Sequence, residues 1–135
     1  MSEYALVSKD TPLISNLNIL ENIALIKEVH QFLKTSKAQE EALSYLKKIN
    51  LQDISKNRPT QCTSLEIFYI SFIRALMTKD MNVIILTPFY LIDNLRDIET
   101  ILSTIKKLYI MKNILILDTF SNEVHYKGCS CNMIR

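Results

Sequence analysis

The chain has 135 residues, enough for one domain with a hydrophobic core but short for a two-domain enzyme. Hydrophobic residues make up 48% of it and glycine occurs once, which favours a helix-rich packed domain and excludes disordered, collagen-like and turn-rich all-β classes. The formal net charge of +2 gives no support to a nucleic-acid partner or to an anionic membrane surface.

The first elements predicted are a short strand at residues 4–7 and, after a loop, a helix that starts at Asn18. Asn18 is a favourable N-cap, and Glu21 follows it at the third helical position. Apolar residues recur behind this start with helical spacing, so we expect a broad buried face. Its members are Ile19, Leu20, Ile23, Ala24, Ile26, Phe32 and Leu33.

Two further helices are predicted before the centre of the chain. Ser36 with Gln39 forms a capping pair for the first, and Thr63 with Glu66 forms a capping box for the second. The buried face of the first is expected to hold Ala42, Tyr45, Leu46 and Ile49. The apolar stripe of the second consists of Leu65, Phe68, Tyr69, Phe72, Ile73, Leu76 and Met77.

The last third of the chain predicts a strand, a helix and a hairpin. Residues 83–86 form a continuous apolar run, typical of a parallel strand covered on both faces, and a helix capped by Asp93 or Asn94 follows. Residues 114–117 read as a second buried strand, and residues 123–127 alternate after a polar turn, which predicts an antiparallel edge hairpin. The stripe of the intervening helix is Ile98, Ile101, Leu102, Ile105, Leu108 and Tyr109.

Residues 58–93 resemble the ATPase subunit of an ATP-binding cassette (ABC) transporter, from its signature loop to its D-loop. A family member reads roughly P-H-Q-L-S-G-G-Q-Q-Q-R-V-A-I-A-R-A-L, a short turn, four apolar residues and D-E-P-T-S-A-L-D. The chain keeps Pro59, Gln61, Arg74-Ala75-Leu76, the apolar strand, Pro88 and Asp93 in register. Residues 17–23, LNILENI, resemble the family's L-T-V-L-E-N-V segment, and residues 50–54 resemble its connection into the signature loop.

The resemblance implies where the family's chemical residues would stand, and at each of these positions the chain departs from the family. The signature positions hold Cys62, Thr63, Ser64, Leu65 and Glu66. Leu86 and Thr87 replace the Walker B aspartate and the catalytic glutamate, Lys9 stands at the Q-loop glutamine, and Thr119 stands at the switch histidine. Lysine carries only donors and cannot ligate a cation. No P-loop pattern G-x-x-x-x-G-K-[ST] occurs, and one glycine could not build it.

The expected fold is therefore α/β, a truncated P-loop NTPase-like domain resembling the second half of an ABC ATPase. It would be a single domain, 1–135, with a small, mostly parallel sheet and an antiparallel edge hairpin. The α/β core would comprise residues 3–9 and 63–127, the helical subdomain residues 18–62, and a loose tail residues 128–135. Without the family's next strand, residues 114–117 would form a bare edge, which the hairpin or a dimer partner would cover.

Three weaker site hypotheses arise from the residues alone. The helix start at Thr63 and Ser64 could attract an anion, although Leu65 and Glu66 oppose this and helix capping is the simpler interpretation. His125, Cys129 and Cys131 are weak candidates for metal ligands, against reduced thiols in a tail. Cys62 has no base beside it in sequence, so nucleophilic catalysis there is a remote alternative.

The sequence has no apolar run of membrane-spanning length and no signal peptide at its N-terminus, and an odd cysteine count fits a reducing compartment. We therefore expect a cytoplasmic protein without direct membrane insertion, peripheral at most at the inner face of the cytoplasmic membrane.

The functional hypothesis is an inactive ABC-ATPase-like protein, not an enzyme and without a cofactor. It would bind an ABC permease or an intact ABC ATPase subunit, as a regulatory or scaffolding partner. The alternative is a stand-alone soluble homo-oligomer with no transport role.

Overall fold

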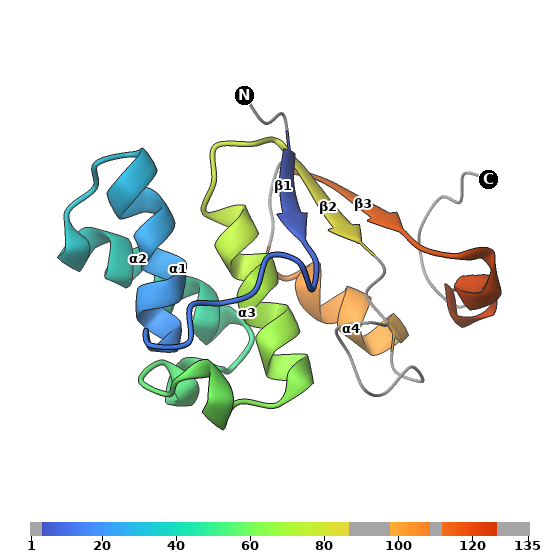
Figure 1. Cartoon of the computed structure of the whole chain (residues 1–135), viewed down its shortest axis with the longest axis horizontal. Helices are drawn as coiled ribbons and strands as arrows, with labels where there is room; N and C mark the ends of the chain where they lie inside the picture. The colour runs from blue at the N-terminus through green and yellow to red at the C-terminus, as the bar shows by residue number, and fades with distance from the viewer. Residues whose placement is uncertain (1–3, 87–97, 109–111, 127–135) are drawn as a thin grey trace.

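A three-stranded parallel sheet forms the centre of the structure (Figure 1). The structure, a computed structural model, describes residues 4–86, 98–108 and 112–126. The strands β1 (Tyr4–Val7), β2 (Asn82–Leu86) and β3 (Asn113–Leu117) lie in the order β1-β2-β3. Their register aligns Val7 with Ile85 and Ile85 with Ile116, so the carboxyl ends of all three strands meet at one edge of the sheet.

In the described parts of the connections between these strands lie four α-helices. The segment from β1 to β2 contains α1 (Ile19–His30), α2 (Thr35–Lys48) and α3 (Ser64–Leu76), with the short 3-10 helices η1 (Gln52–Ile54) and η2 (Pro59–Gln61) before α3. The helix α4 (Ile98–Ile105) lies between β2 and β3. The predicted capping boxes at Asn18 and at Thr63 are both formed. No helix in the described part of the chain is long and apolar enough to span a membrane.

The helix α3 is the centre of the hydrophobic core, between the α1–α2 pair and the sheet (Figure 1). Phe68 and Phe72 are almost completely buried, and each contributes on the order of 2–3 kcal/mol of burial free energy. The predicted stripe is confirmed, but the buried surface of α3 is wider than this stripe. The helices α1 and α2 cover one part of the surface of α3, and β1 covers another part. The buried residues are Phe68, Tyr69, Ile70, Ser71, Phe72, Ile73, Ala75 and Leu76.

The two faces of the sheet differ in how they are covered. Side chains alternate along a strand, so the register assigns each residue to one face. The inner face joins the core with α3 and α4, and it consists of Ala5, Val7, Val83, Ile85, Ile114 and Ile116. The open face carries two exposed asparagines, Asn82 and Asn113, at one end. Its apolar residues are Tyr4, Leu6, Ile84, Leu86, Leu115 and Leu117, of which Tyr4, Leu115 and Leu117 are exposed and the others half-buried. The prediction that residues 83–86 are covered on both faces is therefore correct for the inner face only. The prediction that residues 114–117 form a buried strand is wrong, because Leu115 and Leu117 lie exposed on the open face and Ile114 and Ile116 are half-buried.

The predicted antiparallel edge hairpin is wrong. Residues Phe120–Tyr126 form the 3-10 helix η5, so the described sheet is entirely parallel. The cause is local hydrogen bonding by Asp118, whose carboxylate accepts from the Thr119 N–H at 2.7 Å, from Asn122 Nδ2 at 2.8 Å and from the Tyr126 hydroxyl at 2.7 Å. Short polar side chains that bond nearby groups in this way compete with strand pairing.

Two smaller predictions also fail. The helix α2 begins at Thr35 with Lys34 as its N-cap, without the side-chain cap expected from Ser36 and Gln39. Phe32 is 89% exposed rather than buried, because the chain turns there with a φ of 54° and α1 has already ended at His30. The cap at Asp93 or Asn94, Tyr109 and the tail 128–135 lie outside the described residues.

Candidate functional site

The carboxyl edge of the sheet brings together several of the positions that the sequence singled out. Lys9 follows β1, Leu86 ends β2, and Thr119 follows β3 by two residues, so the parallel register places all three at this edge. Thr87 lies outside the described residues. Ligands of open α/β sheets bind at this edge, so it is the natural place to look for a site.

The residue at the end of β2 is apolar and belongs to the open face. Leu86 is half-buried and lies beside Leu117 in the register. A leucine offers no ligand for a metal ion and no base for water activation. Lys9 is exposed in the turn after β1, which is closed by hydrogen bonds from the Asp10 N–H to Ser8 Oγ at 3.0 Å and from Thr11 Oγ1 to the Ser8 carbonyl at 3.1 Å.

The N-terminus of α3 is closed by its own capping box. Thr63 Oγ1 accepts a hydrogen bond from the Glu66 N–H at 3.1 Å, and Glu66 Oε1 accepts one from the Thr63 N–H at 2.8 Å. Ser64 and Leu65 follow in the first turn and are half-buried. The carboxylate of Glu66 therefore already occupies the position where an anion would benefit from the helix dipole.

Cys62 lies immediately before this helix. Its Sγ donates to the Arg58 carbonyl at 3.6 Å. Burial, and then the negative charge of Glu66, raise the pKa of the Cys62 thiol. Because the thiolate is the reactive form, this environment opposes the activation that a nucleophilic cysteine needs.

Arg74 fixes the loop that leaves the sheet edge, a role that the sequence did not reveal. Its Nη1 donates to the Pro12 carbonyl at 3.0 Å, and its Nη2 donates to the Thr11 carbonyl. Burial lowers the pKa of Arg74. Asn22 holds the next part of the same loop, since its side chain accepts from the Ile14 N–H at 2.7 Å and donates to the Ile14 carbonyl at 3.0 Å. The periodic pattern marked α1 as apolar and so gave no reason to single out Asn22.

The described residues give no geometric support to the metal-site hypothesis. His125 falls in η5 rather than on a strand, and Cys129 and Cys131 lie outside the described residues. Within the described residues, no group of three or more histidine, cysteine, aspartate or glutamate side chains could hold a metal ion.

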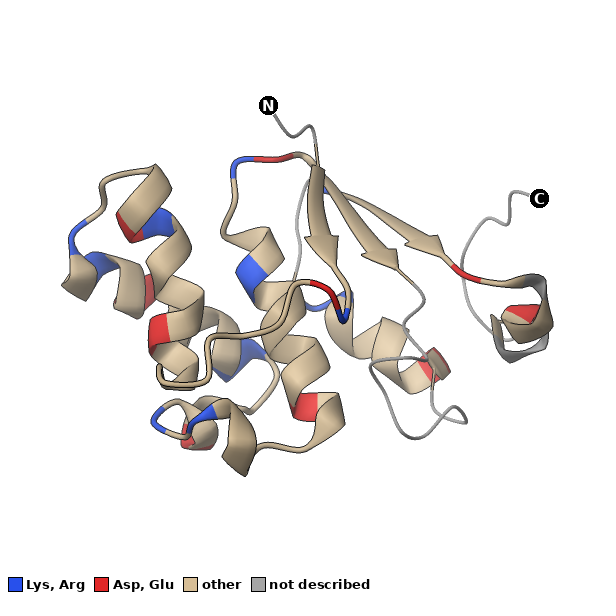
Figure 2. Ribbon diagram, in the orientation of Figure 1, with Lys and Arg blue, Asp and Glu red and all other residues tan. Residues whose placement is uncertain are grey.

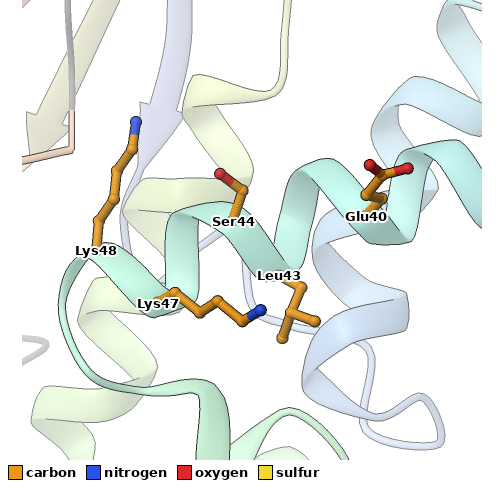
Figure 3. Close-up of a pocket in the computed structure, with 5 residues that line it drawn as sticks. All are labelled: Glu40, Leu43, Ser44, Lys47 and Lys48. Atoms are coloured by element: carbon orange, nitrogen blue, oxygen red, sulfur yellow. The ribbon is translucent and has the colours of Figure 1, made fainter.

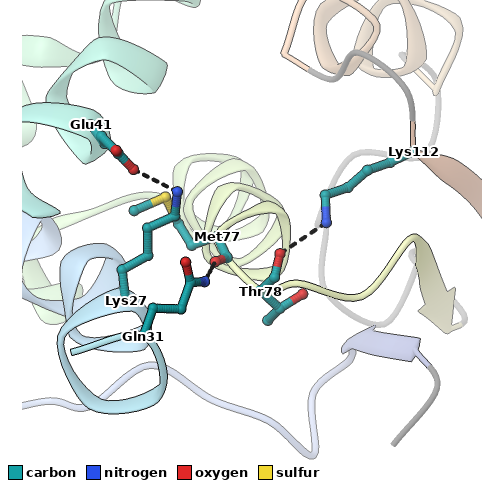
Figure 4. A network of polar contacts seen from close by, with 6 residues as sticks. All are labelled: Lys27, Gln31, Glu41, Met77, Thr78 and Lys112. Carbon is teal, nitrogen blue, oxygen red and sulfur yellow. Dashed lines mark hydrogen bonds and ion pairs between the residues drawn. The ribbon is translucent and has the colours of Figure 1, made fainter. Parts of the chain in front are cut away.

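Polar contacts at the other end of α3 tie the helical pair and the sheet to it (Figure 4). Gln31 Nε2 donates to the Met77 carbonyl at 3.0 Å, and Lys112 Nζ donates to the Thr78 carbonyl at 3.0 Å. These side chains satisfy carbonyl groups where α3 ends. Desolvation lowers the pKa of Lys112, although the nearby charge of Asp80 acts in the opposite direction.

The outer surface of α2 carries a shallow hollow lined by three charged residues, one serine and one leucine (Figure 3). Glu40, Ser44, Lys47 and Lys48 are exposed there, and Leu43 is half-buried. We call these five residues the α2 surface. The helix is held to α1 by an ion pair in which Lys27 Nζ lies 2.6 Å from Glu41 Oε2 (Figure 4).

Comparison with known proteins identifies the fold. No protein family profile matches the chain, and no curated protein matches it either. Among solved structures, the chain is similar to the ATP-binding cassette MJ0796, in a dimeric post-hydrolysis state bound to ADP and Pi, with a TM-score of 0.67 and 22% sequence identity. The match covers 88% of this chain and 53% of that chain, so this chain spans about half the length of its neighbour. The predicted α/β, P-loop NTPase-like fold is thereby confirmed.

Proposed function

We propose that this chain is a catalytically inactive ABC-ATPase-like protein that acts by protein–protein binding, as a regulatory or scaffolding partner of an ABC transporter. Its partner would be an ABC permease or an intact ABC ATPase subunit. The proposed place of action is the cytoplasm, peripheral at the inner face of the cytoplasmic membrane, with no membrane insertion and no nucleic acid involved.

The capping box of α3 is the observation that carries the proposal of inactivity. The hydrogen bonds of Thr63 and Glu66 satisfy two N–H groups at this helix start, and the Glu66 carboxylate repels an approaching phosphate. In the ABC ATPase family, this helix start follows the signature loop, whose glycines let a phosphate approach the backbone. Leu65 puts a side chain where that approach would occur.

The sheet edge supports the same proposal. Phosphoryl transfer depends on a metal ion and charged groups that neutralise the transferred phosphate. Leu86 at the end of β2 and Lys9 after β1 supply no carboxylate or carbonyl ligand from their side chains. Binding of a triphosphate would therefore lack the contacts that hold its metal ion in an active member of the family.

The helical pair supports the proposal of a binding role. The α1–α2 pair is held by the Lys27–Glu41 ion pair and by buried alanines of α2, Ala38 and Ala42, so its outer surface is formed without a ligand. The α2 surface offers charges around Leu43, which suits a polar partner helix or loop more than a lipid phase.

Nucleotide binding is tested first, by thermal unfolding of the protein with millimolar MgATP. A ligand at one hundred times its Kd stabilises a protein by about 2.7 kcal/mol, which shifts Tm by several degrees. We expect no ATP-dependent shift. An intact ABC ATPase treated in parallel should shift, and a shift of several degrees in this protein would contradict the proposed inactivity.

Partner binding is tested by affinity purification from native membranes. Wild-type protein should recover permease or ATPase components of a transporter, and Lys47→Glu/Lys48→Glu should lower the recovery. The matched control is Lys79→Glu/Lys107→Glu, which changes the net charge equally at exposed sites outside α2. Recovery of unrelated soluble proteins only, or equal recovery with both double variants, would count against the proposal.

The second candidate function is a stand-alone homo-oligomeric binding protein with no transport role. The outer edge of β3 favours it, because among the described residues this strand pairs only with β2, and η5 does not pair with it. Light scattering separates the two candidates, since a stable dimer without transporter components supports the second, and a monomer that recovers such components supports the first.

A further inference from the structure

The outer edge of β3 lacks the features that normally protect an edge strand. Among the described residues, β3 pairs with β2 alone. Its five residues, Asn113–Leu117, include neither a charged residue nor a proline, and Figure 2 shows the strand free of charge up to Asp118. Natural edge strands usually carry charges, prolines or bulges that prevent pairing with another chain.

The backbone of β3 presents a defined set of groups to this edge. The Asn113 N–H donates to the Met81 carbonyl at 2.8 Å, so Asn113 bonds toward β2. In a parallel pair, alternate residues bond to the same neighbour, and Leu115 and Leu117 therefore also bond toward β2. The N–H and C=O groups of Ile114 and Ile116 consequently point away from the sheet.

The other edge of the sheet is less available. The strand β1 has four residues, and the turn that follows it folds back, with Thr11 Oγ1 3.5 Å from the Leu6 carbonyl and the Thr11 N–H 3.2 Å from the Ser8 carbonyl. The longer β3 is thus the better candidate for pairing.

We propose that two copies of this chain associate edge to edge through antiparallel β3 strands, with the two-fold axis at Leu115. In this register, Ile114 lies opposite Ile116 of the second copy, and their outward N–H and C=O groups bond reciprocally. Leu115 lies opposite Leu115 of the second copy in a non-hydrogen-bonded pair, where side chains are closest. Such a contact is isologous and closes at two copies.

The length of β3 selects this register. With the axis at Leu115, all five residues of Asn113–Leu117 lie opposite strand residues of the second copy, and two Ile114–Ile116 pairs form reciprocal backbone hydrogen bonds. A shift of two residues in either direction leaves only three strand residues opposed and one hydrogen-bonded pair. The charged groups that flank the strand are already held within one copy, Lys112 by the Thr78 carbonyl and Asp118 by Asn122 and Tyr126.

The open face gains most from this association. Leu115 and Leu117 are 46% and 44% exposed, and both lie at the side of the open face that the second copy adjoins. Antiparallel pairing places the two open faces side by side, with Leu115 opposite Leu115 and Leu117 opposite Asn113 of the second copy, so both leucines gain cross-strand neighbours. The α1–α2 pair lies on the opposite side of α3 from β3 (Figure 1), so the dimer also leaves the α2 surface free. The inference thus deepens the second candidate function and remains compatible with the first.

Disulfide trapping of the full chain tests the register directly. In a background of Cys62→Ser, Cys129→Ser and Cys131→Ser, we introduce Leu115→Cys. Opposed residues of a non-hydrogen-bonded pair have Cα atoms about 4.5 Å apart, within the roughly 4.4–6.8 Å that a disulfide spans. The expected result is rapid formation of a covalent dimer under mild oxidation.

Two cysteine controls accompany this variant. Leu117→Cys tests the register. In the proposed pairing, the cysteines at position 117 of the two copies would lie about 13 Å apart along the strand direction and should not cross-link. Tyr4→Cys tests the surface, because Tyr4 is 47% exposed on the same face of the other edge strand. Equal cross-linking of either control, or none with Leu115→Cys, would overturn the proposal.

Sedimentation velocity of Leu115→Lys gives an independent test. Two lysines opposed at the axis should convert a wild-type dimer into a monomer, whereas Tyr4→Lys should leave the dimer intact, and circular dichroism checks the fold of both. A monomeric wild type at every concentration, or a dimer insensitive to Leu115→Lys, would overturn the proposal; should Leu115→Lys not fold, the cysteine series decides. A negative nucleotide or purification result bears on the transporter role and leaves this dimer test unaffected.

Discussion

Replacing Asn22 with leucine is expected to lower the free energy of unfolding by about 3 kcal/mol. Asn22 is 2% exposed, and its side chain takes part in hydrogen bonds with backbone groups of three residues in the loop and cap before α1. Oδ1 accepts from the Ile14 N–H at 2.7 Å, and Nδ2 donates to the carbonyls of Ile14 at 3.0 Å, Asn18 at 3.0 Å and Leu17 at 3.3 Å.

The magnitude follows from these bonds. The Asn22 amide has two hydrogens and one oxygen, so its four contacts amount to about three full hydrogen bonds, each worth roughly 1 kcal/mol net. Leucine fills a similar volume without any of them, so little of the loss is offset. Ile14 is exposed, so water can satisfy its backbone groups after the replacement and no further penalty is added.

The assay is urea denaturation followed by circular dichroism, with Asn16→Leu as the control. Asn16 lies in the same loop but is exposed, so its replacement should change stability by less than about 0.5 kcal/mol. A change of about 3 kcal/mol corresponds to roughly 10 °C in Tm for a chain of this size. Equal stability of Asn22→Leu and Asn16→Leu would show that the loop does not depend on Asn22.

Three further predictions concern the ends of α3 and the loop at the sheet edge. Arg74→Lys keeps the charge, but a lysine cannot reach both the Thr11 and the Pro12 carbonyl. Limited proteolysis should therefore cut the loop around Pro12 faster in this variant than in wild type. Equal cleavage rates would contradict the role of the guanidinium. Thr63→Ala should cost about 1 kcal/mol in urea denaturation and Thr63→Ser close to nothing, because serine retains the capping oxygen; equal losses would refute the cap. Alkylation of Cys62 should reach half its maximal rate at a higher pH than alkylation of a free cysteine. The reason is that burial and the charge of Glu66 raise the pKa of the Cys62 thiol, and the reactive thiolate forms mainly above this pKa. A midpoint at or below that of free cysteine would contradict this environment.

The elements that the sequence predicted well are those whose local signals agree with their burial. The boxes at Asn18 and Thr63 combine a cap, an acidic third residue and an apolar repeat, and both helices begin where these signals place them. The three strands and their parallel direction follow from apolar runs separated by helices. Propensity and tertiary packing favour the same structure at these positions.

The predictions that failed concern segments where side-chain contacts or a helix end override the local sequence pattern. Residues 123–126 alternate like a strand, but Asp118 draws Asn122 and Tyr126 into a helical turn. Phe32 continues the apolar spacing of α1, but the helix ends before it. The positions that the sequence singled out lie at the sheet edge and at the start of α3, whereas the contacts of Arg74 and Asn22 depend on a loop whose path the sequence does not specify.

The positions that resemble the chemical positions of an ABC ATPase are occupied here by residues that serve the fold. Thr63 and Glu66 cap α3, and Leu86 extends the apolar open face beside Leu117. Placing a carboxylate at position 86 would remove a half-buried leucine and charge that face, so this substitution is expected to weaken the sheet. The leucine side chains at this edge offer no metal ligand, but they offer apolar contact to another protein surface. This apolar contact is the physical basis for proposing a binding function.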